Sequence, residues 1–160
     1  MTTSIGQPAP DFTLYADNGE QVTLSDLRGT PIVLAFFPAA FTGVCETELC
    51  SFRDSMSAYN DIEATVLGIS VDSRFSNAAF VAANDLNFQI LSDYTRCTID
   101  AYGIRFSDLA GMSGYDVAQR SVFVVDAAGP VSWRWLADNP GDEPPYEEVL
   151  SAVRSLTSPA

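Results

Sequence analysis

The stretch PIVLAFFPAAFTGVC, residues 31–45, decides the fold of this chain. Residues 32–37 are apolar throughout, as in a β-strand that is covered on both faces of its sheet. Pro38 ends that strand, because proline has no N–H to donate to a neighbouring strand. From Thr42 the apolar residues recur every three or four positions, a period that indicates an amphipathic helix. We therefore expect a central strand, a short turn, and a helix that begins close to Cys45.

The segments that follow this stretch predict an α/β fold. The helix is expected to run over residues 42–59, with its apolar face formed by Cys45, Leu49, Phe52, Met56 and Tyr59. Residues 64–71 (ATVLGISV) indicate a second buried strand, and a strand–helix–strand unit closes with a right-handed crossover between parallel strands. Residues 76–84 indicate the next helix, with Ser76 as a candidate N-cap.

Shorter elements complete the prediction. They are two strands within residues 11–24, a helical turn at 25–29, a strand at 88–91, a helical piece at 97–102, a hairpin of residues 121–126 and 131–137, and a final helix after Pro145 with Glu147 and Glu148 in its first turn. Trp133 and Trp135 share one side of their strand, where we expect them to face the core. The prediction is one α/β domain over residues 1–160, a mixed central β-sheet flanked by helices.

The charge of the chain is strongly negative. The chain has 21 acidic residues and 8 basic residues, all of them arginine, which gives a net charge of −13. Lys and His are absent. Nucleic acids and anionic membranes attract clustered basic residues, so we expect neither as a partner. An acidic, lysine-free composition suits a cytosol rich in salt, where the repulsion between carboxylates is screened. We therefore expect a halophilic protein.

Sequence features also bear on the cellular compartment. Residues 1–10 (MTTSIGQPAP) have neither the basic start nor the apolar stretch of a secretory signal. The longest apolar run, residues 31–41, is interrupted by Pro38 and falls short of the roughly 20 residues of a membrane helix. We expect a cytoplasmic protein. Its three cysteines, an odd number, indicate thiols that stay reduced until they react rather than structural disulfides.

Cys45 is a candidate nucleophile. A thiol reacts as the thiolate, whereas a free cysteine with a pKa of about 8.5 is mostly protonated at neutral pH. The chain has no histidine, which excludes Cys–His and Ser–His catalytic pairs. Two features can still stabilise a thiolate in this chain: the unpaired N–H groups in the first turn of a helix, and the positive charge of an arginine. By position alone, a buried and inert cysteine stays the alternative.

The residues around Cys45 resemble the active-site pattern of the peroxiredoxins: Pro, three residues, Thr or Ser, two residues, Cys. Here the pattern is formed by Pro38, Thr42 and Cys45. The resemblance extends over most of the chain, through GQPAPDFTL (6–14), FRD (52–54), LSDYTRCTIDAYGI (91–104) and RSVFVVDAAG (120–129).

The resemblance implies a thioredoxin-like fold and the reduction of hydrogen peroxide, organic hydroperoxides and often peroxynitrite. Cys45 would be the peroxidatic cysteine, which becomes a sulfenic acid. Thr42 would hydrogen-bond the peroxide and the sulfur, Arg120 would stabilise the thiolate and the polarised O–O bond, and Glu48 would orient Arg120. Pro38 would shield the site from water. Without the resemblance, Arg120 and Glu48 are ordinary surface residues.

The resemblance further implies an enzyme that needs no metal, flavin or haem as cofactor. A thioredoxin-like protein or a low-molecular-weight thiol would serve as the reductant. The related branches include monomers and homodimers, so both oligomeric states stay open.

Two branches of the family share features with this chain. A second cysteine five residues after the first, Cys50, is similar to the Q-type or bacterioferritin comigratory protein branch, in which it resolves the sulfenic acid as a disulfide. The segment AAFTGVCETEL (39–49) looks more like the alkyl hydroperoxide reductase E branch, which has one catalytic cysteine. Cys97 is the less favoured resolving candidate, and both Cys50 and Cys97 have a spectator role as the alternative.

Helix geometry sets a condition on a bond between Cys45 and Cys50. Five residues of α-helix correspond to a rise of about 7.5 Å and a rotation of about 140°. A disulfide requires Cα atoms within roughly 7 Å of each other. The start of the helix must therefore unwind locally before these two sulfurs can bond.

Three alternatives to a peroxidase differ in what they require of the cysteines. A thioredoxin-like disulfide reductase is disfavoured because no two cysteines have the Cys-x-x-Cys spacing. A metal site of Cys45, Cys50 and Cys97 lacks a fourth ligand and the usual short spacing. A redox-sensing binding or holdase protein that uses Cys45 as a switch stays open. Such a sensor would stop after one equivalent of peroxide, whereas an enzyme would turn over.

Overall fold

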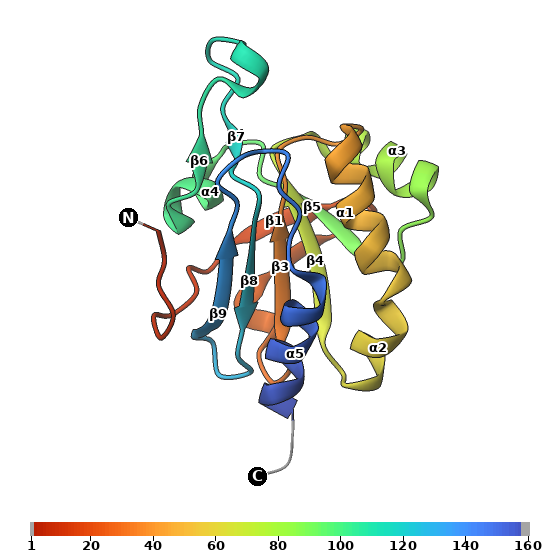
Figure 1. The fold of residues 1–160 in the computed structure, drawn as a ribbon, viewed down its shortest axis with the longest axis vertical. Helices are drawn as coiled ribbons and strands as arrows, with labels where there is room; N and C mark the ends of the chain where they lie inside the picture. Colours follow the sequence, from red (N-terminus) through yellow and green to blue (C-terminus); the bar gives the residue numbers. More distant parts are fainter. Residues whose placement is uncertain (1, 158–160) are drawn as a thin grey trace.

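The apolar residues that precede Pro38 form β3 (Ile32–Phe36), whose five side chains are all buried. In the computed structural model, which describes residues 2–157, β3 lies inside a seven-stranded sheet of order β2-β1-β5-β4-β3-β8-β9 (Figure 1). It runs parallel to β4 (Thr65–Ser70) and antiparallel to β8 (Ser121–Val125). The other strands of this sheet are β1 (Thr13–Ala16), β2 (Gln21–Thr23), β5 (Gln89–Ser92) and β9 (Val131–Leu136). The predicted mixed central sheet is confirmed.

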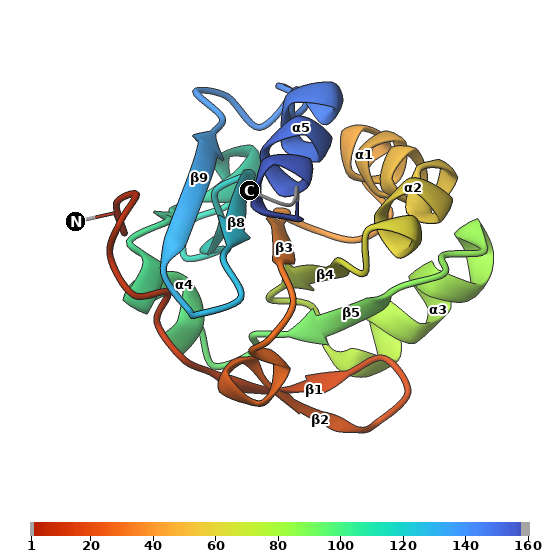
Figure 2. The ribbon, with the colours of Figure 1, turned by 90° about the horizontal axis from the view of Figure 1, so that it is seen from below.

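Helices cover both faces of this sheet, as Figure 2 shows. In chain order they are the 3-10 turn η1 (Leu24–Leu27), α1 (Gly43–Asp54), α2 (Met56–Asp61), α3 (Arg74–Asn84), α4 (Cys97–Tyr102), the 3-10 turn η2 (Leu109–Gly111) and α5 (Tyr146–Thr157). On one face, α1, α2, α3 and α5 contribute buried side chains to a common core. On the other face, α4 packs into a second core. Successive residues of β3 belong alternately to the two cores, as the pleat of a strand requires.

A glycine lets α1 lie close to the sheet. A Cβ atom at Gly68, in the middle of β4, would be 3.1 Å from Leu49 Cδ1 of α1 and 2.5 Å from Ile90 Cδ1 of β5. The absence of a side chain at Gly68 therefore sets how deeply the helix that begins near Cys45 can pack.

Two helix boundaries differ from the prediction. The helix expected over residues 42–59 is divided at Ser55, whose φ of −97° and ψ of 0° end α1 before α2 begins. The apolar period continues across this break, so periodicity could not reveal it. Ser76 is not the N-cap of α3; the N-cap is Ser73, whose hydroxyl accepts a hydrogen bond from Ser76 N at 3.1 Å. An N-cap residue has a non-helical backbone conformation. Ser73 meets this condition because it precedes the helix, whereas Ser76 lies inside the helix.

The segment between α4 and β8 contains a hairpin that was not predicted. β6 (Arg105–Phe106) and β7 (Val117–Ala118) form a separate two-stranded sheet, and their connecting loop projects at the top of the molecule in Figure 1. Strands of two residues are too short for their alternation of polar and apolar residues to be recognised.

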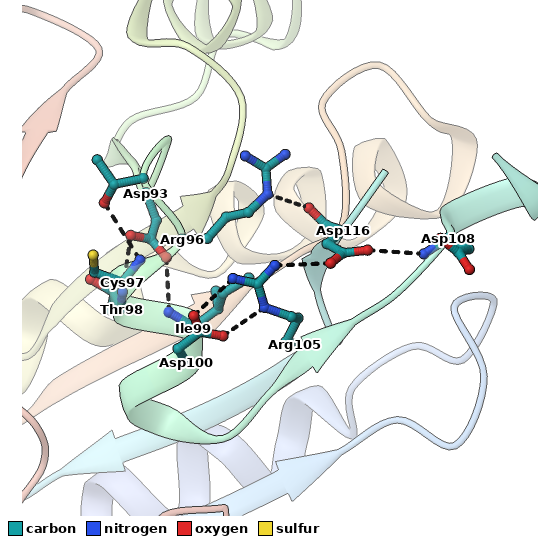
Figure 3. Close-up of polar contacts among 10 residues, drawn as sticks. Asp93, Arg96, Cys97, Thr98, Ile99, Asp100, Arg105, Asp108 and Asp116 are labelled. Atoms are coloured by element: carbon teal, nitrogen blue, oxygen red, sulfur yellow. Dashed lines mark hydrogen bonds and ion pairs between the residues drawn. The ribbon is translucent and has the colours of Figure 1, made fainter. Parts of the chain in front are cut away.

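An exposed cluster of ion pairs attaches this hairpin to α4 (Figure 3). Arg105 donates two hydrogen bonds to the carboxylate of Asp100, at 2.7 and 2.8 Å, and one to Asp116 at 2.9 Å. Arg96 donates to the backbone oxygen of Asp116 at 2.7 Å. We refer to Arg96, Asp100, Arg105 and Asp116 as the hairpin cluster.

The tryptophan pair of β9 occupies the predicted side of its strand. Trp133 and Trp135 are partly buried against the core that α1 and α5 share. Arg134 lies between them in sequence and donates to Thr3 O at 2.6 Å. The expectation that this pair faces the core is confirmed, although neither ring is fully buried.

Candidate active site

Antiparallel strand pairing brings the two halves of the candidate site together. Phe36, at the end of β3, pairs with Ser121, at the start of β8. The turn that follows β3 and Arg120, which precedes β8, therefore lie at the same end of the sheet. Ser121 also pairs with Leu136 at the end of β9, so the loop after β9 reaches the same place.

Cys45 lies in the first turn of α1, as predicted. The helix begins at Gly43 with Thr42 as its extended N-cap residue, and Cys45 is fully buried. Arg120, 75 residues away in sequence, donates from Nη2 to Cys45 Sγ at 3.2 Å. A guanidinium and the N-terminal end of a helix thus both act on this sulfur, and both stabilise negative charge.

Glu48 binds the same guanidinium one helical turn after Cys45. Arg120 Nη1 donates to Glu48 Oε1 at 2.7 Å, and the two side chains are 2% and 0% exposed. Glu48 Oε2 is buried without a hydrogen-bond partner among the described residues. The structure therefore brings Cys45, Glu48 and Arg120 into one buried group, although nothing in the sequence outside the resemblance distinguished the last two.

Burial controls the protonation of this group. It raises the pKa of Glu48 to about 7, against the opposing effect of Arg120 and with a further increase from the charge of Glu143. Burial also lowers the pKa of Arg120, but the charges of Glu48 and Cys45 outweigh it and keep that pKa above its ordinary value. Arg120 consequently stays protonated and can stabilise an anionic sulfur at any physiological pH.

Thr42 and Pro38 lie on the turn that leads into α1. The Thr42 hydroxyl donates to Ala39 O at 2.8 Å, so its oxygen lone pairs are the part that can accept a hydrogen bond from a ligand. Pro38 and Arg120 both line a small cavity of about 30 Å³, together with Phe106 of β6. Pro38 and Arg120 therefore border the same cavity, and the shielding role of Pro38 stays a prediction.

Asp72 is a site residue that was not predicted. Its carboxylate accepts from Ala40 N and from Ser70 Oγ, both at 2.8 Å, and so ties the turn before α1 to the end of β4. Phe41, the next residue of that turn, has a φ of 66°, a left-handed conformation that is strained for a bulky side chain. An aspartate directly after a buried strand was the available signal for this role.

The other two cysteines occupy different environments. All three cysteines are free thiols. Cys50, also on α1, is half-buried, and its Sγ contacts Asn84 Oδ1 of α3 at 3.6 Å. Cys97 is exposed at the start of α4 (Figure 3). The side chains of α4 and α1 belong to the cores on opposite faces of the sheet. Within residues 2–157, no three or more Cys, Asp or Glu side chains gather in a way that could hold a metal ion.

Comparisons with known proteins show the family of this chain. The sequence matches the AhpC/TSA family over residues 5–134. Peroxiredoxin Bcp of Bacillus subtilis is 36% identical over 157 residues, covering 98% of this chain and 99% of that protein. Peroxiredoxin-2 of Rattus norvegicus is 37% identical over 162 residues, covering 95% of this chain and 78% of that protein. The crystal structure of peroxidoxin BcpB from Mycobacterium tuberculosis superposes with a TM-score of 0.86 at 28% identity, over 98% of this chain and 99% of that chain.

The Bcp relatives match this chain in both sequence and structure. The alignment with Bcp spans nearly all of both proteins, whereas the rat protein extends well beyond its aligned part. The structural superposition on BcpB likewise spans both chains. The chain therefore belongs to the AhpC/TSA family, as a thioredoxin-fold peroxiredoxin of the Q or Bcp branch, and so to the thiol peroxidases.

Proposed function

We propose that this chain reduces hydrogen peroxide, organic hydroperoxides and peroxynitrite with Cys45 as the peroxidatic cysteine. The observation that carries this proposal is the 3.2 Å contact between Arg120 Nη2 and Cys45 Sγ in a fully buried setting. In a chain without histidine, this arginine and the start of α1 supply the positive potential that a thiolate needs.

The first chemical step is a displacement at oxygen. The Cys45 thiolate forms a bond to one peroxide oxygen, the O–O bond breaks, and the other oxygen leaves with the bonding electron pair and takes up a proton from solvent. The cysteine is oxidised to a sulfenic acid, while hydrogen peroxide is reduced to water, an organic hydroperoxide to an alcohol, and peroxynitrite to nitrite. Arg120 and the oxygen of Thr42 hold the peroxide, Glu48 holds Arg120, and Pro38 keeps water away.

In the second step, Cys50 condenses with the sulfenic acid to form a disulfide, with release of water. Cys45 is buried and Cys50 contacts Asn84, so α1 must unwind at its start and leave α3 before the sulfurs meet. The strained backbone at Phe41 lowers the cost of that unwinding. Cys97 is disfavoured as the partner within one chain because α4 lies across the sheet from α1.

The remaining partners follow from the same proposal. A thioredoxin-like protein or a small thiol reduces the disulfide, and the protein works as a monomer or homodimer in the cytoplasm. None of the helices within residues 2–157 is long and apolar enough to span a membrane. The net charge of −13 supports a salt-rich cytosol, and stability that is highest in dilute buffer would contradict this part of the proposal.

Steady-state peroxide consumption with an excess of dithiol tests the peroxidase assignment. The wild-type chain should consume many equivalents of hydrogen peroxide, and Cys45→Ser should consume none. Cys97→Ser is the matched control and should turn over like wild type. Consumption that stops after one equivalent in wild type would instead indicate the redox-sensing binding protein.

Peptide mapping under non-reducing conditions tests the second step. After one equivalent of peroxide, we expect a bridge between Cys45 and Cys50 in wild type and a persistent sulfenic acid in Cys50→Ser. A sulfenic acid in both proteins would indicate a one-cysteine peroxidase that an external thiol reduces. A bridge between Cys45 and Cys97 would refute the assignment of Cys50.

A further inference from the structure

The guanidinium of Arg120 has a third partner besides Cys45 and Glu48. Nε and Nη2 of Arg120 both donate to the backbone oxygen of Pro140, at 3.1 and 2.9 Å. Among the described residues, four hydrogen bonds thus occupy four of the five N–H groups of this arginine. Pro140 belongs to the loop between β9 and α5.

This oxygen is presented by a tight turn. In the sequence Asn139-Pro140-Gly141-Asp142, Asp142 N donates to Asn139 O at 3.0 Å, and Asn139 N donates to Asp142 Oδ2 at 3.1 Å. Proline at the second position of such a turn fixes its φ near −65°. The loop is anchored beside the site because Ala137 N donates to Arg120 O at 2.9 Å. We call residues 139–142 the NPGD turn.

The NPGD turn restricts how the guanidinium can rotate. Glu48 accepts a hydrogen bond from Nη1 of Arg120 and so fixes one end of the planar guanidinium. This contact alone would still allow the guanidinium to rotate about it. The Pro140 oxygen accepts from the opposite edge, on the side that includes Nη2. With both edges held, the second N–H of Nη2 is directed at Cys45 Sγ. Orientation of this kind determines how strongly a donor stabilises a charge in a buried site.

We propose that the NPGD turn is a positioning element of the peroxidatic site, and that Asp142 acts through the Pro140 carbonyl and Arg120 to favour the Cys45 thiolate. The inference rests on the proposed function of Cys45. Asp142 touches neither the sulfur nor the peroxide in this scheme. Its contribution is to hold the turn that holds the guanidinium.

Three variants test the proposal, each made in full-length protein with Cys50→Ser and Cys97→Ser so that only Cys45 reacts. Asp142→Ala removes both the charge and the acceptor for Asn139 N. Asp142→Asn removes the same charge but keeps an oxygen acceptor, so it should rescue the turn. Asp138→Ala removes the same charge from an exposed position of the same loop and serves as the control.

Two readouts are measured for each variant: the second-order rate constant with hydrogen peroxide, and the pH profile of Cys45 alkylation by iodoacetamide. We expect Asp142→Ala to lower the peroxide rate constant about 3- to 10-fold and to move the midpoint of the alkylation profile to higher pH. Asp142→Asn and Asp138→Ala should stay within about twofold of the parent in rate, with an unmoved midpoint.

The alkylation profile does not require peroxidase activity, so the two hypotheses fail in different ways. If the parent protein does not react with peroxide, the proposed function is overturned. If Asp142→Ala still shifts the alkylation profile in that case, the positioning role is kept. An unmoved midpoint in Asp142→Ala, or equal losses in Asp142→Ala and Asp142→Asn, would overturn the positioning role. A variant that only destabilises the fold should have a lower melting temperature but an unchanged midpoint of the alkylation profile. The profile therefore separates a positioning role from a purely structural one.

Discussion

Arg120 and Arg105 each hold a carboxylate at 2.7 Å, in two regions that differ chiefly in their access to water. Arg120 and Glu48 are 2% and 0% exposed between the sheet and α1. Arg105 and Asp100 of the hairpin cluster are 36% and 52% exposed. The contact distances alone would rank the two pairs as equal, so the difference in burial must account for any difference in their behaviour.

The carboxylates of the two regions have opposite pKa shifts. Burial raises the pKa of Glu48 to about 7, despite its contact with Arg120. Hydrogen bonds from Arg105 lower the pKa of both Asp100 and Asp116, since water still solvates these groups. Ionising Glu48 in its buried position thus costs stability, whereas the hairpin cluster is an ordinary surface network.

Replacing each arginine should produce the largest contrast between the two regions. Arg120→Met should lower the rate constant for peroxide reduction about 10²- to 10³-fold, because it removes the donor to Cys45 Sγ. Arg105→Met should leave that rate within about twofold of wild type, since the hairpin cluster does not touch the sulfur. Stopped-flow mixing of each reduced protein with hydrogen peroxide measures both effects.

Loss of Arg120 also leaves Glu48 buried without a charged partner, so Arg120→Met is expected to be less stable by about 3–5 kcal/mol. Arg120→Lys is the control that keeps the positive charge. A single ammonium cannot reproduce the forked contacts to Cys45, Glu48 and Pro140, so this variant should also lose at least about tenfold in rate. Full activity in a folded Arg120→Lys protein would show that charge alone suffices.

A pH titration of stability should separate the two regions next. The folded-state pKa of Glu48, about 7, lies above the ordinary value of 4.5, so the folded protein binds the proton more tightly between these pH values. The free energy of unfolding should therefore fall as pH rises through this window, by about 3 kcal/mol for such a shift. The contribution is fully present below about pH 4.5 and is lost above about pH 7.

Urea unfolding of wild type and Glu48→Gln across pH 4.5 to 8 measures this dependence as a difference between the two proteins. Asp100→Asn is the matched surface control. The lowered pKa of Asp100 gives stability that is present above its ordinary value of 3.8 and is lost only as pH falls below it, so its difference from wild type should be flat in this range. A flat difference for Glu48→Gln as well would mean that Glu48 is already ionised at pH 4.5.

The sequence alone predicted those parts of the site that depend on local pattern. The apolar run of β3 and the change of period at Thr42 placed Cys45 in the first turn of a buried helix, which the structure confirms. The missing histidine directed attention to arginine. The partners Arg120 and Glu48 came only from the resemblance to peroxiredoxins, because no local pattern links residues 72 positions apart.

Other features could not be read from the sequence for physical reasons. The division at Ser55 leaves the apolar period intact, and the hairpin of β6 and β7 has strands too short to show alternation. The group that binds Arg120 at Pro140 is a backbone carbonyl, and every residue has one, so no residue type in the sequence marks it. The placement of such a group depends on how β8 and β9 pair, and that pairing is a property of the whole sheet.

Removing a charge from the hairpin cluster should have the smallest effect on stability, and this effect should depend most strongly on salt. Asp116→Asn keeps an oxygen that can accept from Asp108 N, and it removes both the charge and the acceptor oxygen that face Arg105. We expect the melting temperature to fall by less than about 3 °C in dilute buffer, because exposed pairs contribute little. In 1 M NaCl the Debye length is about 3 Å, so the difference between variant and wild type should vanish.

The whole chain should respond to salt in the opposite direction, since screening its net charge of −13 relieves repulsion and raises the melting temperature of both proteins. The informative quantity is therefore the gap between the two melting curves, which should close as salt increases. A gap that persists in 1 M NaCl would show that Asp116 stabilises the hairpin through its hydrogen-bond geometry. In that case the hairpin cluster would resemble the group around Arg120 in mechanism, and exposure to water would no longer be the property that separates the two regions.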